Sequence, residues 1–245
     1  MQQSNAYIIA FAAGLTIVLG GLLSVTAVSL KERQKMEIEL EKKKQILSAV
    51  MDIEGISKQE LAGIYDERIK SIAVNYDGEI QTEIVPEDVN IEKEYKKKPE
   101  DRIYPVYKFI NESNPDNFES VIIPVFGFGL WDFIWGYVAL ESDLSTMKGV
   151  SFDHRGETPG LGARITDAVV QERFKGKNIY NSSGELVSVK MLKSENNANL
   201  DENEVDGMSG ATITANGVND MLLKYLNSYQ TYFEKLKAEK SISSL

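Results

Sequence analysis

The chain has 245 residues, 42% of them hydrophobic, and carries 27 Lys and Arg against 37 Asp and Glu, a formal net charge of −10. This length accommodates one soluble domain with a hydrophobic core in addition to a membrane segment. The acidic balance argues against nucleic acid as a partner, because a phosphate backbone needs a basic face. The absence of cysteine excludes disulfides, iron–sulfur ligation and thiol catalysis by this chain alone, so a redox role needs an organic cofactor. With His154 as the single histidine and no His/Cys spacing, we expect no metal site.

The first 30 residues have the composition of a membrane span. Residues 1–30 contain no charged side chain, and residues 6–30 are mostly Ala, Ile, Leu, Val, Phe and Gly. At about 1.5 Å per residue, a helix of this length crosses a hydrocarbon core about 30 Å thick. The alternative is a cleaved signal peptide, but the N-terminal region lacks Lys and Arg and the apolar run is too long for one. We therefore expect a transmembrane anchor over residues 1–30.

A charged segment follows the expected anchor. Residues 31–51 are rich in Glu and Lys and contain few turn formers, which predicts a helix leaving the membrane. We assign residues 31–55 to a stalk and residues 56–245 to a soluble domain.

Helix and strand alternate at the start of the soluble domain. Ser57 and Glu60 have the spacing of a capping box ahead of a short helix, and residues 72–76 predict a strand that ends in a turn. Residues 86–117 contain four prolines and predict a surface connection around a strand near residues 103–110.

The middle of the chain predicts an antiparallel meander. Residues 119–126 and 133–141 are rich in β-branched and aromatic side chains and are separated by a glycine turn, and residues 147–153 add a third strand. Helical spacing follows in residues 164–174 and again from Ala215 onward. The predicted fold class is α+β, an antiparallel sheet with packed helices.

A glycine-bearing stretch, Asp206 to Thr212, lies at the N-terminus of the last predicted helix. Free backbone N–H groups and the positive end of the macrodipole make such a terminus a place where phosphate binds. Gly210 and Ala211 remove side-chain bulk, while Ser209, Thr212 and Thr214 offer hydroxyls that cap the helix or hold a phosphate. From residue types alone, a Ser/Thr-capped helix after an acidic loop is the favoured interpretation, because such caps are common.

Three stretches carry a resemblance to a known family. Asp-x-x-Ser-Gly-Ala-Thr at residues 206–212 closely resembles the flavinylation motif of proteins that carry FMN in phosphoester linkage to threonine. Residues 156–162 resemble the Glu-Thr-Pro-Gly-Leu-Gly signature of the same FMN-binding domain. Residues 127–131 are similar to the Gly-x-Gly-Leu-Trp region of one subfamily, the C subunits of the sodium-translocating NADH:quinone oxidoreductases.

The resemblance implies a role for each motif residue. Thr212 is the expected covalent attachment point of FMN, made by a flavin transferase that recognises Asp206 and reaches the hydroxyl past Ser209, Gly210 and Ala211. Asp206 equally fits a loop-turn residue. Further FMN-binding residues are expected in the other two motifs, and these are Thr158, Gly160, Leu161, Gly162 and Trp131. Trp131 would stack on the ring, although core packing is its alternative; His154 and Glu157 receive no assigned role beyond a hydrogen bond to the ring.

The resemblance also implies a biological setting. It predicts a one-electron relay that works with the other subunits of the oxidoreductase complex. The expected location is the bacterial inner membrane, which the chain crosses once, with its soluble domain on the periplasmic side. By the positive-inside rule, the basic residues after the anchor (Lys31, Arg33 and Lys35) favour a cytoplasmic soluble domain. However, acidic residues accompany them, and long domains translocate regardless of such a charge bias. Two alternatives stay open: the G subunit of an Rnf-type ferredoxin:NAD oxidoreductase, and a non-redox membrane-anchored assembly module.

Overall fold

The computed structural model describes residues 4–115 and 117–243. The chain divides into two compact units, Met1–Lys42 and Lys43–Leu245.

The N-terminal unit consists of helix α1 (Asn5–Ser48), whose last turns belong to the second unit. No proline precedes Pro86, so nothing removes a backbone donor from this long helix. Its N-terminal part is long and apolar enough to span a membrane, and its side chains there are exposed. The hydroxyls of Thr16 and Thr26 each donate to the carbonyl four residues earlier at 2.8 Å, which satisfies them within the helix as a hydrocarbon environment requires.

The second unit is built on an antiparallel meander, as the sequence predicts, and the strands near residues 72 and 103 extend it to five strands in the order β1-β2-β3-β4-β5. Its strands are β1 (Ile69–Val74), β2 (Tyr104–Ile110), β3 (Phe118–Phe128), β4 (Phe133–Glu141) and β5 (Met147–His154). Helices α2 (Lys58–Arg68), α3 (Ile91–Tyr95), α4 (Ala168–Gln171) and α5 (Thr212–Ser243) complete the unit, with a small parallel pair formed by β6 (Lys190–Met191) and β7 (Glu204–Val205). This is the α+β architecture that the sequence predicts.

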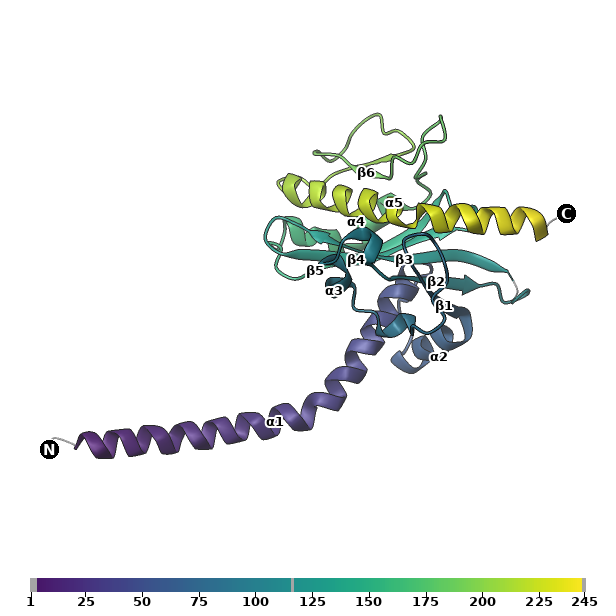
Figure 1. Ribbon diagram of the computed structural model, residues 1–245. Coiled ribbons are helices and arrows are strands. Elements are labelled where there is room, and N and C mark those ends of the chain that lie inside the picture. The colour runs from purple at the N-terminus through teal and green to yellow at the C-terminus, as the bar shows by residue number, and fades with distance from the viewer. Residues whose placement is uncertain (1–3, 116, 244–245) are drawn as a thin grey trace. The chain divides into compact units, whose positions relative to one another are not determined.

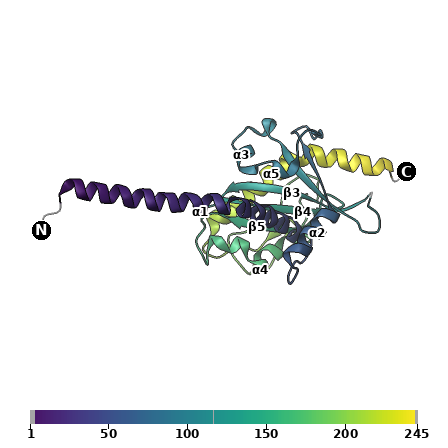
Figure 2. The same cartoon turned by 90° about the horizontal axis from the view of Figure 1, so that it is seen from below.

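Both faces of the sheet are buried, because alternate residues of each strand point to opposite sides. On β3, Val121 and Ile123 belong to the core under α5, whereas Ile122 between them belongs to a second core. The second core lies against α2 and the last turns of α1 and includes Ile46 and Leu47. Figure 1 shows α5 along one face of the sheet, and Figure 2 shows α2 on the opposite face.

Helix α5 lies very close to the end of β3. A Cβ atom at Gly217 would come within 2.3 Å of the Phe128 carbonyl oxygen, and one at Gly127 within 2.9 Å of Met221 Cβ. Further along the helix, the buried Tyr229 hydroxyl donates to the Pro105 carbonyl at 2.7 Å. These contacts fix where the first turn of α5 stands relative to the β3–β4 turn.

The capping box predicted at Ser57 is present: its hydroxyl accepts from the Glu60 backbone N–H, and the Glu60 carboxylate accepts from the Ser57 N–H at 3.0 Å. The helix predicted over residues 164–174 is different in the structure. It is a series of short turns, Gly162–Thr166, Ala168–Gln171 and Glu172–Phe174. Asp167 is extended, with φ −68° and ψ 131°, and interrupts the helix while the apolar side chains around it still reach the core.

Candidate functional site

The three motif segments, far apart in the sequence, meet at the N-terminus of α5. A Cβ atom at Gly210 would come within 2.9 Å of Leu161 Cδ2, so the residues before α5 lie against the loop of residues 156–162. The indole Nε1 of Trp131 donates to Thr158 Oγ1 at 3.1 Å, which joins the β3–β4 turn to the same loop. The structure therefore brings together the sequence-predicted residues of all three motifs.

Thr212 is the first residue of α5 and is half-buried. Ser209 and Gly210 before it are exposed, and Ala211 is buried with its N–H donating to the Met208 carbonyl at 3.0 Å. Within residues 4–115 and 117–243, no group accepts a hydrogen bond from the backbone N–H groups of residues 212–214. These N–H groups can therefore receive an anion at the helix terminus.

The loop of residues 156–162 makes a tight turn that requires a glycine. Gly160 has φ +76°, in the left-handed region that favours glycine. The N–H groups of Leu161 and Ala163 both donate to the Thr158 carbonyl, at 3.1 and 3.2 Å. The loop closes tightly as a result and leaves the Leu161 side chain exposed.

Trp131 is 65% exposed and does not belong to the core, which answers the core alternative for this residue. It stands in the turn that joins β3 to β4, where the Gly129 N–H donates to the Asp132 carbonyl at 2.9 Å. Other large apolar side chains of the three segments are also exposed, namely Phe128, Leu130, Leu161 and Ile213. Exposed apolar side chains beside an anion-binding terminus suit a ligand with both an aromatic part and a phosphate.

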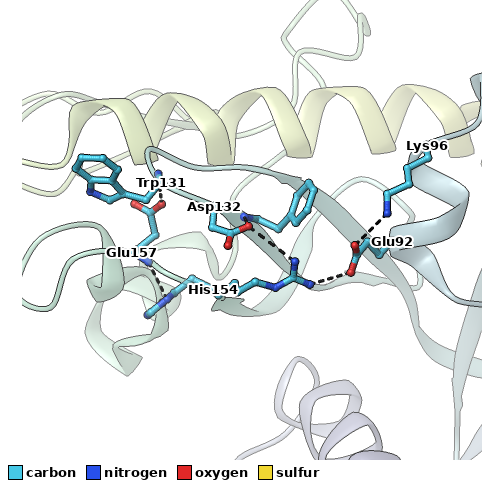
Figure 3. Close-up of polar contacts among 8 residues, drawn as sticks. Glu92, Lys96, Trp131, Asp132, His154 and Glu157 are labelled. Carbon is cyan, nitrogen blue, oxygen red and sulfur yellow. Dashed lines mark hydrogen bonds and ion pairs between the residues drawn. The ribbon is translucent and has the colours of Figure 1, made fainter. Parts of the chain in front are cut away.

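Glu157 lies at the junction of the three segments and is only 4% exposed. Its Oε1 accepts from the backbone N–H groups of Leu130 and Trp131, both at 2.9 Å, and its Oε2 accepts from Thr214 Oγ1 at 2.5 Å. Figure 3 shows the carboxylate of Glu157 beside the backbone of Trp131. Sequence reasoning named Glu157 and Thr214 but not their partnership, because the two residues are 57 positions apart.

Asp206 supports the loop before α5. Its Oδ1 accepts from the Asn197 backbone N–H at 2.9 Å and from the Asn197 side chain at 2.7 Å. Both bonds lower the pKa of Asp206 below its usual range, and the bond from the Asn197 backbone has the larger effect. The Arg173 guanidinium donates to the carbonyl oxygens of Asp206 and Gly207, at 3.2 and 2.5 Å. Asp206 thus makes the contacts expected of a loop-turn residue, which is the alternative interpretation of this position.

An ion-pair network extends from the end of β5. Arg155 donates to Glu92 at 2.8 Å and lies 3.9 Å from Asp132, and Lys96 donates to Glu92 at 3.2 Å (Figure 3). Both bonds lower the pKa of Glu92, and the bond from Arg155 has the larger effect. His154 Nδ1 accepts from the Glu157 backbone N–H at 3.2 Å, a local contact within the same loop. This network ties α3 to the β3–β4 turn.

The protein has relatives of known name. A family model described as "FMN-binding domain" matches residues 129–227, which include almost all of the three motifs. The chain is 32% identical to the C subunit of the Na(+)-translocating NADH-quinone reductase of Vibrio campbellii over 221 residues, with 84% of each chain covered. It is 40% identical to the corresponding C subunit of Chlamydia muridarum over 141 residues, but this match spans only 44% of that relative's length and 51% of this chain.

A solved structure shows the same likeness. The crystal structure of the C subunit from Parabacteroides distasonis has a TM-score of 0.71 and 36% sequence identity, with 83% of this chain and 96% of that chain covered. Both sequence and fold therefore assign this chain to the family of C subunits of the Na(+)-translocating NADH-quinone reductases.

Proposed function

We propose that the chain carries FMN covalently, through a phosphoester to the Thr212 hydroxyl. The observation that carries this proposal is the position of Thr212: half-exposed at the start of α5, beside N–H groups with no acceptor in the described residues, and within the FMN-binding domain match. A phosphate on Thr212 would stand at the positive end of the α5 macrodipole.

The residues around Thr212 fit the rest of the cofactor. Leu161 and Trp131 offer exposed apolar surface for the ring, with Trp131 held in place by Thr158. Gly160 and Gly162 permit close approach of the backbone, so Thr158, Gly160, Leu161, Gly162 and Trp131 are the proposed ring contacts. When bound, FMN supplies the electron-transfer chemistry, and the protein supplies attachment and orientation.

A flavin transferase would make the bond during maturation. The exposed Ser209 and Gly210, with the small Ala211, leave a way for that enzyme to reach Thr212. Asp206 is proposed as part of the recognised sequence, in addition to its contacts with Asn197.

The proposed role is an electron relay within a sodium-pumping NADH:quinone oxidoreductase. NADH oxidation, quinone reduction and sodium passage would occur on other subunits, because this chain has no dinucleotide fingerprint and no multi-span ion path in its sequence. Family membership favours this role over that of the Rnf-type G subunit. Identification of the subunits that co-purify with the chain tests it, and an Rnf-type set of partners would overturn it.

The proposed arrangement in the membrane has residues 1–30 as a single-pass anchor, residues 31–55 as a stalk and residues 56–245 as a periplasmic FMN-binding domain. The length and apolar composition of α1 support the anchor. Protease added to intact spheroplasts should digest the domain. Digestion only after the membrane is opened would place the domain in the cytoplasm.

Mass spectrometry tests the covalent link. The native chain, expressed with its transferase, should carry an FMN-sized adduct on the peptide that contains Thr212, and Thr212→Ala should lack it. Thr166→Ala is the matched control, because Thr166 is another exposed hydroxyl beside the same loop. A native chain without the adduct, or a Thr212→Ala chain that keeps it, contradicts the proposal.

A further inference from the structure

We infer that Glu157 is a positioning residue for the flavin: its two carboxylate oxygens set the spacing between the Thr212 turn of α5 and the Trp131 turn. The inference rests on the proposed attachment of FMN at Thr212. It concerns how the ring would be held once the phosphoester has formed.

The Glu157 carboxylate bonds two separate elements. One oxygen takes both backbone N–H groups of the β3–β4 turn, from Leu130 and Trp131, and the other takes the Thr214 hydroxyl. Leu130 is 27 residues and Thr214 is 57 residues from Glu157. A single side chain therefore joins the element that presents Trp131 to the element that presents Thr212.

Two glycines make space for the Glu157 side chain. A Cβ atom at Gly129 would come within 2.5 Å of Glu157 Oε1, and one at Gly162 within 2.3 Å of Oε2 and 2.5 Å of Thr214 Oγ1. Glycines on two sides thus leave room for the carboxylate and for nothing larger. Contact with Glu157 is therefore one reason for Gly129 and Gly162, in addition to the contact with the ring proposed for Gly162.

The groups around Glu157 suit a negatively charged side chain. Burying a carboxylate is costly unless donors surround it, and all three groups that meet Glu157 are donors. Bonds of this charge-assisted kind are stronger than neutral ones, and the N-terminal turn of α5 adds a favourable dipole. Removal of the carboxylate leaves the Leu130 and Trp131 N–H groups and the buried Thr214 hydroxyl without this acceptor, and the two turns are then free to separate.

The consequence concerns the distance between the ring and Trp131. The phosphoester fixes only one end of FMN, at Thr212, while the exposed Trp131 indole is placed by its turn and by Thr158. A stacked tryptophan quenches flavin emission by electron transfer, so emission of the native holoprotein reports this spacing. Glu157 acts on the ring through these two turns and does not need to touch it.

The experiment compares full-length chains matured with the transferase, measuring covalent flavin after denaturing electrophoresis and the ratio of native to denatured flavin emission. Glu157→Ala should lower the amount of attached flavin or raise this ratio several-fold, toward the ratio of Trp131→Ala. Glu157→Gln should resemble the native chain, because its amide oxygen accepts from the turn and its NH₂ group donates to the Thr214 oxygen. In a Trp131→Ala background, Glu157→Ala should raise the ratio no further.

Asp143→Ala is the matched control. Asp143 makes the same set of contacts, with two backbone N–H groups (Ser145 and Thr146) and the Thr146 hydroxyl, but in the turn between β4 and β5, beside the C-terminal part of α5. This variant should keep both native readouts. If Glu157→Ala does not fold, Thr214→Val replaces it, with Thr214→Ser as its conservative partner.

The possible outcomes separate the two proposals. A native chain without covalent flavin overturns the proposed function itself. A flavin-bearing native chain whose readouts are unchanged in Glu157→Ala or Thr214→Val overturns the positioning role alone. A Glu157→Gln chain as defective as Glu157→Ala would also overturn it, because a side chain that keeps the hydrogen-bonding groups would then fail to hold the two turns.

Discussion

Gly210 and Leu161 lie against each other across 49 positions of sequence, so that a methyl group at position 210 would have to displace the end of the Leu161 side chain. The backbone of Gly210 has φ +78°, and a Cβ atom built there would come within 2.9 Å of Leu161 Cδ2. The contact joins the residue two positions before Thr212 to the loop that follows β5. The left-handed backbone is therefore the main reason for glycine at position 210, and the contact with Leu161 adds to it.

Gly210→Ala should lower the yield of covalent flavin. The substitution strains the left-handed backbone by about 1 kcal/mol and also pushes Leu161 away from the α5 terminus. In-gel flavin fluorescence of the matured chain measures the yield. Gly184→Ala is the control, since Gly184 has the same φ of +78° but has nothing within 4 Å of the position that a Cβ atom would take. Equal flavin yields in the two variants would contradict the prediction.

Gly162→Ala should destabilise the whole soluble unit. Its Cβ would overlap both Glu157 Oε2 and Thr214 Oγ1, and overpacking of this kind costs about 1–3 kcal/mol, to which the lost hydrogen bond is added. Thermal unfolding followed by circular dichroism should show a clear fall in Tm. Gly63→Ala, in the exposed interior of α2 where nothing lies within 4 Å, should leave Tm unchanged or raise it. A Gly162→Ala Tm equal to that of the native chain is the contrary result.

Tyr229→Phe should lower the free energy of unfolding by about 1 kcal/mol, because the lost hydroxyl leaves the buried Pro105 carbonyl without its donor. Urea denaturation measures the change. Tyr225→Phe is the matched control on the same helix, since the buried Tyr225 hydroxyl has no hydrogen-bond partner among the described residues. The control should be neutral or slightly stabilising. Equal losses in both variants would show that the Pro105 bond contributes nothing.

Asp206→Asn should cost stability at neutral pH but not in acid. The Asn197 donors lower the pKa of Asp206 in the folded state. A lowered folded pKa contributes stability that is present above the unfolded value of about 3.9 and is lost as the pH falls through the folded value. The Tm difference between the native chain and the variant, measured from pH 7 down to pH 3, should therefore shrink below about pH 4. A difference that stays constant across this range would exclude the carboxylate as its source.

Much of the fold follows from local pattern. The strand at residues 133–141 has the predicted bounds, and the capping box at Ser57 forms as its spacing indicates. Alternation of side chains also predicts strands, but it does not say that both faces of this sheet are covered. The division of β3 between two cores comes from where α5 and α2 return to the sheet.

Other features were not predictable because they depend on distant partners. The turns of residues 162–174 have helical spacing, but Asp167 is extended, and the Gln171 amide donates instead to the carbonyls of Phe152 and Ile165. The pair of β6 and β7 forms in a segment with no strand pattern, where Asn219 of α5 bonds both backbone groups of Met191. In each case a hydrogen bond between residues 19 or 28 positions apart accompanies the backbone conformation.

The sequence by itself determined most of the long helices and strands, the apolar N-terminal helix and the three motifs that mark the family, because these depend on neighbours along the chain and on residue type. Only the tertiary structure decided that Trp131 stands exposed, that Asp206 holds a loop, and that Glu157 joins the turn before Asp132 to the first turn of α5. The physical reason is that hydrogen bonds and van der Waals contacts act over a few ångströms. Residues separated by 57 positions interact only after the sheet and α5 have brought them together.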